Sequence, residues 1–559
     1  MGVSQSKASE CVLETPKGSL RGIQLTSKDG QPIYQRYTKI PYAQPPTKAL
    51  RWRRPQPLPS DYSFNTSSSQ PGDYTKFGPV CPQPVYDYKK ATLENPDAAP
   101  LEPHAQDEDC LFVNIFVPAG TPPSKGWPVC FFIHGGWLQV GDAMQDHEYD
   151  PEDLFASTDT PRIVISPTHR LNMFGFLAGS VLKELAEDPE PGNYGFWDQR
   201  LALEWTVANI GFFGGNPDNI TVGGLSAGAN STFFQLYYDT YLPPEKRLIK
   251  RVFLWSNAVG IQPNPATSGM ADLQFEELCS PAILNINPTL PVMQKLDALR
   301  ATQPETLISM IEKLNLHTFR ATTDNDFISP EFLKSLHDGS FTTRLAENGV
   351  EVMVGEVADE GNLYRLVNPP STFDGLRLQL QNYYPVPVVE ALLKHYELPD
   401  PNATGKEEEW KDAYAKIVAD CQVHATIRGL TSTLLDPPQA YGVKALPESC
   451  MYRYRIRYRA KSLDTWIDPA VGVCHGADGP IWWCSVFRTG CSEKDKQHVI
   501  EFLKPFGKFI AGEADIGWGA KGTRKIREMG TDGTTSVVED EDWQRGMGVW
   551  TCMKGAQGI

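Results

Sequence analysis

The chain has 559 residues, 41% of them hydrophobic, so it is long enough to bury a large core. Its formal net charge of −16 disfavours nucleic acid or an anionic membrane as the main partner. No apolar run approaches the roughly 18 residues of a transmembrane helix, and no secretory signal is seen, which predicts a cytoplasmic protein. The eleven cysteines form no C-x-x-C pair, so we expect mostly free thiols and no metal site.

The N-terminus carries a lipid-attachment pattern. Gly2 follows Met1, and Ser6 lies four residues later, which fits the N-myristoylation sequence M-G-x-x-x-[ST]. A chance match is the alternative interpretation. One myristoyl chain gives only weak, reversible binding, so the pattern predicts at most a peripheral membrane association. We expect residues 1–12 to be a flexible segment.

Strand-like apolar runs alternate with helical patterns along the rest of the chain. Strands are predicted at 110–117, 127–133, 162–166, 220–223, 252–255, 350–354 and 451–458. Helices are predicted at 194–210, 291–299, 304–314, 388–396 and 494–511. This alternation favours an α/β fold with a large, mostly parallel central sheet flanked by helices. We expect residues 13–559 to form a single domain, with a helix-rich cap region at about 261–345.

Arginines alternate with aromatic and aliphatic residues at 451–459. A basic and aromatic surface for nucleic acid is one interpretation. The favoured interpretation is a strand whose arginine face pairs with the many acidic residues, because alternate side chains of a strand point to opposite faces.

The most informative motif is G-x-S-x-G at 224–228, between the β-like run 219–223 and the helix-like run 229–238. In this context the motif is a nucleophile elbow, where a tight turn lifts the serine hydroxyl out of the sheet. Ser226 is therefore the candidate nucleophile. A serine hydroxyl needs a base, an acid that orients the base, and donors for an oxyanion. In hydrolases with this elbow, the chain order is serine, acid, histidine.

His475 is the candidate base, since it lies between glycines, one loop after the strand predicted at 451–458. Cys474 beside it is a weaker candidate for a thiol nucleophile, because it has no independent base. The other histidines after Ser226 lie in or beside segments with helical or polar character: His317, His337, His395, His424 and His498.

The candidate acid follows the strand predicted at 350–354, in the turn Asp359-Glu360-Gly361. Both carboxylates occupy a suitable position, and the residues alone do not choose between them. A solvated turn with two surface acids is the alternative interpretation.

The candidate oxyanion loop follows the strand predicted at 127–133. His134, Gly135, Gly136 and Trp137 have the character of the HGGG loop of lipases and esterases. We expect the N–H groups of Gly135, Gly136 and Ala227 to bind the oxyanion. His134 is expected to orient the loop without transferring a proton.

Taken together, these motifs resemble the type B carboxylesterases, the family of cholinesterases and some fungal lipases. The match covers about residues 23–509 and is strongest at 213–228 and 108–118, which correspond to the two family signatures. The resemblance implies an α/β-hydrolase fold, Glu360 as the acid, His475 as the base and a disulfide between Cys81 and Cys110.

Three departures from the family pattern narrow this expectation. Leu225 stands where a glutamate usually precedes the nucleophile, which removes a buried carboxylate. Trp137 replaces the third glycine of the oxyanion loop, so bulky esters of tertiary alcohols are disfavoured. No tryptophan occurs at 94–97, which disfavours a cholinesterase.

The sequence therefore predicts a serine carboxylesterase that hydrolyses a small-molecule ester through an acyl-enzyme, with no metal or organic cofactor. Acyl transfer to another acceptor, or formation or cleavage of a lactone, stays open because it shares the acyl-enzyme. A lipase is disfavoured by the polar 81–110 loop. A non-catalytic binding relative is least favoured, since all three candidate catalytic residues are present. The oligomeric state is not predicted.

Overall fold

The computed structural model describes residues 6–85, 104–145, 149–183, 191–402, 404–465, 467–488 and 491–558. Gly2, the expected lipidation site, lies outside these ranges.

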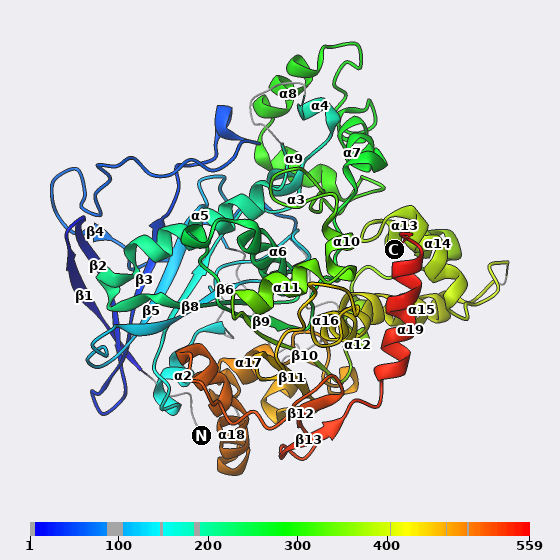
Figure 1. Ribbon diagram of the computed structural model, residues 1–559. Coiled ribbons are helices and arrows are strands. Elements are labelled where there is room, and N and C mark those ends of the chain that lie inside the picture. The colour runs from blue at the N-terminus through cyan, green and yellow to red at the C-terminus, as the bar shows by residue number, and fades with distance from the viewer. Residues whose placement is uncertain are drawn as a thin grey trace.

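Within the described ranges, one mixed sheet of 13 strands runs through the molecule (Figure 1). Its order is β1-β2-β3-β5-β7-β6-β8-β9-β10-β11-β12-β13, and β4 pairs with β2. Neighbours from β7 to β12 are parallel. The pairs toward the two ends of the sheet are antiparallel, apart from the short parallel pair of β2 with β4. The strands are Lys7–Thr15 (β1), Gly18–Thr26 (β2), Pro32–Pro41 (β3), Gly72–Asp73 (β4), Phe112–Pro118 (β5), Trp127–Ile133 (β6), Ile163–Pro167 (β7), Gly215–Leu225 (β8), Arg251–Trp255 (β9), Glu351–Val357 (β10), Met451–Ile456 (β11), Lys525–Met529 (β12) and Thr535–Glu539 (β13).

Helices connect the strands and cover both faces of the sheet (Figure 1). The α-helices are Glu152–Ser157 (α2), Asn172–Phe176 (α3), Ser180–Lys183 (α4), Tyr194–Asn209 (α5), Ala227–Tyr241 (α6), Met270–Cys279 (α7), Val292–Ala301 (α8), Pro304–Ile311 (α9), Phe332–His337 (α10), Ser340–Glu347 (α11), Gly361–Leu366 (α12), Phe373–Gln381 (α13), Val386–His395 (α14), Glu407–Ala419 (α15), Ala425–Leu435 (α16), Gly479–Trp482 (α17), Glu493–Ala511 (α18) and Trp543–Gly555 (α19).

Strand β6 shows how the sheet separates two hydrophobic layers. Phe131 and Ile133 belong to the cluster that includes α5 and α6, whereas Cys130 and Phe132 belong to the cluster that includes α18. Alternate residues of a strand point to opposite faces, so a central parallel strand covered on both sides must be apolar throughout. This burial explains why 127–133 is a continuous apolar run. The α/β fold with a large, mostly parallel sheet is thus confirmed.

The predicted strands and helices are present, with ends shifted by up to about five residues. The N-terminal region differs from the expectation. Residues 7–12 were expected to be flexible, but they lie in β1, which pairs with β2 along its full length. Cys11 and Leu13 pack against the main hydrophobic cluster, which holds this edge strand in place.

Residues 451–456 of the arginine-rich segment form the buried strand β11, which ends before Arg457 and Arg459. The predicted pairing of the arginines with acidic residues is confirmed. Tyr452, Tyr454 and Ile456 pack in the hydrophobic cluster beneath α18. The arginines pair with acids: Arg453 with Asp540, Arg455 with Glu528, Arg457 with Glu541 and Arg459 with Asp464.

The region expected as a cap is helix-rich. Helices α7, α8 and α9 gather at the top of Figure 1, away from the sheet, while α11 lies beside α6. No helix among the described residues is both long and apolar enough to cross a membrane.

Candidate active site

Ser226 lies where β8 ends and α6 begins. Its backbone has φ 58° and ψ −124°, a strained conformation for a residue with a side chain. Its N–H donates to the carbonyl of Trp255 at 2.8 Å, which ties the turn to the end of β9. A Cβ on Gly224 or Gly228 would lie 2.4 or 2.0 Å from the carbonyl oxygen of Ile133, so the turn packs too closely on β6 for any other residue type. The local geometry is that of an elbow.

Glu360 lies just after β10 and is fully buried. Its Oε1 accepts a hydrogen bond from the N–H of Val357 at 2.9 Å, and its Oε2 lies 2.6 Å from Nδ1 of His475. The neighbouring Asp359 has a different partner, since its Oδ2 accepts from the N–H of Val473 at 2.8 Å. Of the two carboxylates left open by the residues alone, Glu360 is the one in contact with the imidazole.

His475 lies in the loop that follows β11, and only 6% of its surface is exposed. The hydroxyl of Tyr364, on α12, lies 3.4 Å from Nδ1 and 3.5 Å from Nε2 of the imidazole. No hydrogen bond joins the side chains of Ser226 and His475 among the described residues. Catalytic hydrogen bonds are often long in free enzymes and form only when substrate is bound.

Two weaker sequence candidates are engaged elsewhere or are unreactive. Nδ1 of His424 lies 2.7 Å from Glu356, in a buried network with Arg428. Burial raises the pKa of the Cys474 thiol to about 12, so this thiol is not a nucleophile at neutral pH.

The candidate oxyanion loop lies against the elbow. A Cβ on Gly135 would stand 3.1 Å from Cβ of Ser226, and Gly136 has φ 105°, so both positions favour glycine. Trp137 continues the turn with φ 55°. Ala227 is the first residue of α6, and the N–H groups of a first helical turn have no partner within the helix.

His134 is the first residue of the candidate oxyanion loop, and its side chain is buried. Its Nδ1 lies 2.8 Å from the carbonyl oxygen of Gly135, and its ring stacks on His169 with centroids 4.6 Å apart. Burial lowers the pKa of His134 to about 4, so the imidazole is neutral near pH 7. A neutral ring held in this way is suited to supporting the loop.

Cys81 and Cys110 form a disulfide within the described ranges. The described residues contain no group of three or more histidine, cysteine, aspartate or glutamate side chains placed to hold a metal ion.

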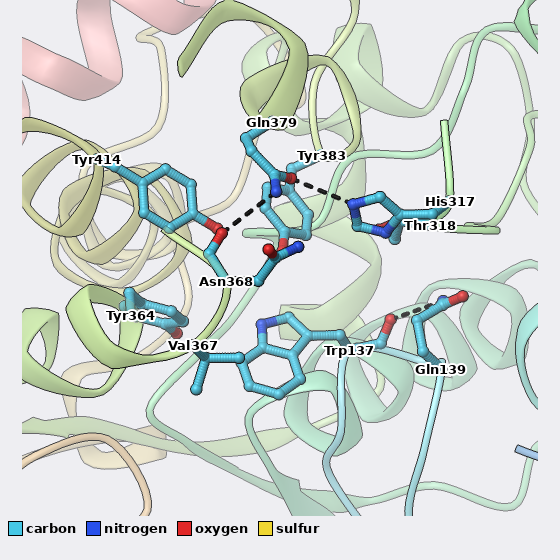
Figure 2. A pocket seen from close by; sticks show the side chains of 10 residues that line it. All are labelled: Trp137, Gln139, His317, Thr318, Tyr364, Val367, Asn368, Gln379, Tyr383 and Tyr414. Atoms are coloured by element: carbon cyan, nitrogen blue, oxygen red, sulfur yellow. Dashed lines mark hydrogen bonds between the residues drawn. The ribbon is translucent and has the colours of Figure 1, made fainter. Parts of the chain in front are cut away.

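A pocket opens beside the candidate oxyanion loop, and Figure 2 shows its lining. Trp137 of the oxyanion loop and Tyr364, which contacts His475, form two of its walls, with ring centroids 6.4 Å apart. Apart from Trp137, and His317 as one of the histidines considered as the base, no lining residue was singled out from the sequence. Tyr364 follows Glu360 by one helical turn, and this spacing is the signal that could have identified it.

Comparison with known proteins agrees with the fold and the motifs. The family model "Carboxylesterase family" matches residues 9–538. An uncharacterized esterase/lipase of Schizosaccharomyces pombe is 41% identical, over 98% of both chains. A carboxylic ester hydrolase of Gibberella moniliformis is 35% identical, over 95% of this chain and 94% of its own. A para-nitrobenzyl esterase of Bacillus subtilis is 31% identical, over 63% of each chain.

The chain therefore belongs to the carboxylesterase family, which has the α/β-hydrolase fold, and the three relatives above are named as esterases or ester hydrolases. The resemblance seen in the sequence motifs is confirmed.

Proposed function

We propose that this enzyme is a serine carboxylesterase in which Ser226 is the nucleophile, His475 the base and Glu360 the acid that orients the base. The observation that carries the proposal is the 2.6 Å contact between Nδ1 of His475 and Oε2 of Glu360. A buried carboxylate on Nδ1 fixes the tautomer of the imidazole, so that Nε2 can accept a proton.

In the first half of the reaction, Oγ of Ser226 attacks the ester carbonyl carbon and its proton passes to Nε2 of His475. The carbonyl oxygen becomes an oxyanion, which accepts hydrogen bonds from the N–H groups of Gly135, Gly136 and Ala227. The intermediate then collapses, the C–O bond of the ester breaks, and the imidazolium protonates the departing alcohol. An acyl group remains on Ser226.

In the second half, His475 takes a proton from water, and the resulting hydroxide attacks the acyl carbon. Collapse of this intermediate releases the carboxylic acid and returns the proton to Ser226. These steps move protons only between serine, imidazole, water and the leaving alcohol, so side chains and backbone of this chain account for all of them.

A different acceptor in the second half would make the enzyme an acyltransferase or a lactone-forming enzyme. The chemistry at Ser226 is the same in both cases, so the acceptor decides between them. Products formed in the presence of a competing alcohol or amine distinguish these activities from hydrolysis.

The test is hydrolysis of p-nitrophenyl esters from acetate to palmitate by wild type and by Ser226→Ala, together with labelling by a fluorophosphonate. We expect Ser226→Ala to lose activity by a factor on the order of 10³ or more, and to lose labelling. Ser231→Ala is the matched control, because Ser231 is buried one turn further along α6. It should keep activity and labelling.

A wild-type protein that hydrolyses no ester and is not labelled would contradict the proposal and favour a binding function. A sharp rate increase on emulsified long-chain triglyceride would favour a lipase.

A further inference from the structure

Two residues that adjoin the proposed catalytic residues, Trp137 and Tyr364, line the pocket in Figure 2. Trp137 follows Gly136 directly, so its side chain leaves the oxyanion loop beside the proposed donors. Tyr364 contacts the imidazole of His475, with ring centroids 5.1 Å apart. A substrate whose carbonyl lies at Ser226 and whose oxyanion lies at Gly135 and Gly136 would therefore extend one of its two ends toward this pocket.

The pocket is lined mainly by aromatic and polar side chains. Most of its remaining walls come from segments distant in sequence. They are Gln379 from α13, Tyr414 from α15, Tyr383 after α13, and His317 and Thr318 after α9. Figure 2 shows these side chains facing a common space above Trp137.

The polar side chains that line the pocket are neutral, and several of them form hydrogen bonds with one another. Nε2 of His317 lies 3.3 Å from Oε1 of Gln379, and Nδ1 of His317 lies 3.3 Å from the hydroxyl of Thr318. Burial lowers the pKa of His317, which keeps this imidazole neutral at pH 7. The other polar groups of the lining are amides, hydroxyls and the indole N–H of Trp137, and no lysine, arginine, aspartate or glutamate stands among the described residues that line the pocket.

This lining disfavours both a charged group and a long alkyl chain. A carboxylate or an ammonium group would lose its water without meeting an opposite charge. An alkyl chain would cover amide and hydroxyl groups without replacing their hydrogen bonds to water. Among the described residues that line the pocket, Val367 alone is aliphatic. Four aromatic rings offer flat contact surfaces instead: Trp137, Tyr364, Tyr383 and Tyr414.

We propose that this pocket selects esters in which one side carries an uncharged ring bearing a hydroxyl or a comparable oxygen. Gln379 and His317 recognise the oxygen, and the aromatic walls hold the ring. This inference rests on the proposed function, because it assumes that an ester reacts at Ser226. It adds the substrate class, which neither the family nor the catalytic residues define.

The experiment uses two ester series with a substituted phenyl ring two methylenes from the ester. In one series, acetate esters of 2-phenylethanol vary on the alcohol side. In the other, ethyl esters of 3-phenylpropanoic acid vary on the acyl side. Each ring carries a para hydroxyl, methyl or carboxylate group, and the methylenes isolate the reacting centre from its electronic effect. We expect kcat/KM to favour the hydroxyl ester over the methyl ester by about ten-fold in one series. The carboxylate ester should be the poorest substrate.

The variants Gln379→Leu and His317→Phe should bring the ratio of hydroxyl to methyl kcat/KM toward one, since each removes a polar group of the lining. Gln294→Leu is the matched control, because Gln294 is exposed on α8 and outside the pocket. It should keep the wild-type ratio. Labelling by a fluorophosphonate shows that each variant is folded and has an intact nucleophile.

The inference is wrong if labelled wild type prefers the methyl or carboxylate ester in both series. It is also wrong if the preference for hydroxyl survives in both pocket variants. Failure of the proposed function looks different, because wild type would then neither hydrolyse any of the six esters nor react with the fluorophosphonate.

Discussion

Gln139 and Phe319 exchange two hydrogen bonds across the edge of the pocket. Nε2 of Gln139 donates to the carbonyl of Phe319 at 2.7 Å, and Oε1 accepts from the N–H of Phe319 at 3.0 Å. The same Nε2 donates to the carbonyl of Trp137 at 3.0 Å. One buried side chain thus ties the candidate oxyanion loop to the segment that carries His317 and Thr318.

We expect Gln139→Leu to lower kcat/KM on p-nitrophenyl acetate by about 10- to 100-fold, because small displacements of oxyanion donors are costly. Gln274→Leu is a matched control. Gln274 is also buried and donates to the carbonyls of Leu316 and Thr318, but it does not contact the oxyanion loop. We expect the two variants to lose similar thermal stability, whereas Gln139→Leu should lose much more activity than Gln274→Leu. Equal losses of activity in the two variants would contradict a positioning role for Gln139.

The strained backbone of Ser226 predicts a difference between two inactive variants. A side chain in this conformation costs on the order of 1–3 kcal/mol, and glycine avoids that cost. Ser226→Gly should therefore melt at a higher temperature than Ser226→Ala, although glycine gains more entropy on unfolding. Differential scanning calorimetry measures this comparison. A lower melting temperature for the glycine variant would show that the strain is smaller than the entropy difference.

A buried ionic network beneath the site predicts a large effect on stability. Asp540 accepts from Arg428 at 2.7 Å and from Arg453 at 2.5 Å, and all three side chains are buried. Asp540→Ala leaves the two guanidinium groups with less compensating charge, and removing one partner of a buried pair typically costs about 3–5 kcal/mol. Urea unfolding should show this loss. Glu347→Ala breaks the exposed pair with Lys444 and should leave the transition unchanged.

Asp478 predicts a pH-dependent contribution to stability. It is fully buried, its Oδ2 accepts from Nε1 of Trp482, and burial together with the charge of Glu360 raises its pKa from 3.8 to about 6. Between these values, the folded protein keeps a proton that the unfolded chain has lost. The contribution of Asp478 is therefore complete below about pH 4 and is lost as the pH rises through 6.

Asp478→Asn removes this dependence. The melting temperature of the variant minus that of wild type should increase as the pH is raised from 4 to 7.5. Asp297→Asn changes an exposed carboxylate on α8 and should keep a constant difference from wild type over the same range. A constant difference for Asp478→Asn as well would contradict the raised pKa.

The central strands and the elbow could be predicted because burial on both faces produces a local signal. The run 127–133 is apolar at nearly every position, and its predicted bounds agree with β6. The edge strands β1 and β13 are exposed at most positions, so their sequences carry little apolar pattern. They form because a neighbouring strand supplies hydrogen bonds, which a single sequence does not reveal.

The candidate site likewise contains some residues that local motifs identify and others that only the folded structure brings together. Ser226 and His475 stand in local motifs between glycines, so their chemistry was visible in the sequence. Gln139, His317 and Gln379 are ordinary polar residues in three distant segments, and they become a pocket only through long-range packing. The choice between Asp359 and Glu360 depended on a family resemblance, because the two carboxylates differ in orientation and not in sequence context.

The proposed catalytic residues follow three separate strands, and this arrangement orders events during synthesis. Ser226 lies in the first half of the chain, whereas His475 lies in its last fifth. During synthesis, Ser226 therefore emerges from the ribosome long before His475, the residue that would activate it. A lone serine hydroxyl is a poor nucleophile, so a nascent chain would not react with the esters around it. Reactivity would arrive only when the late strands have joined the sheet.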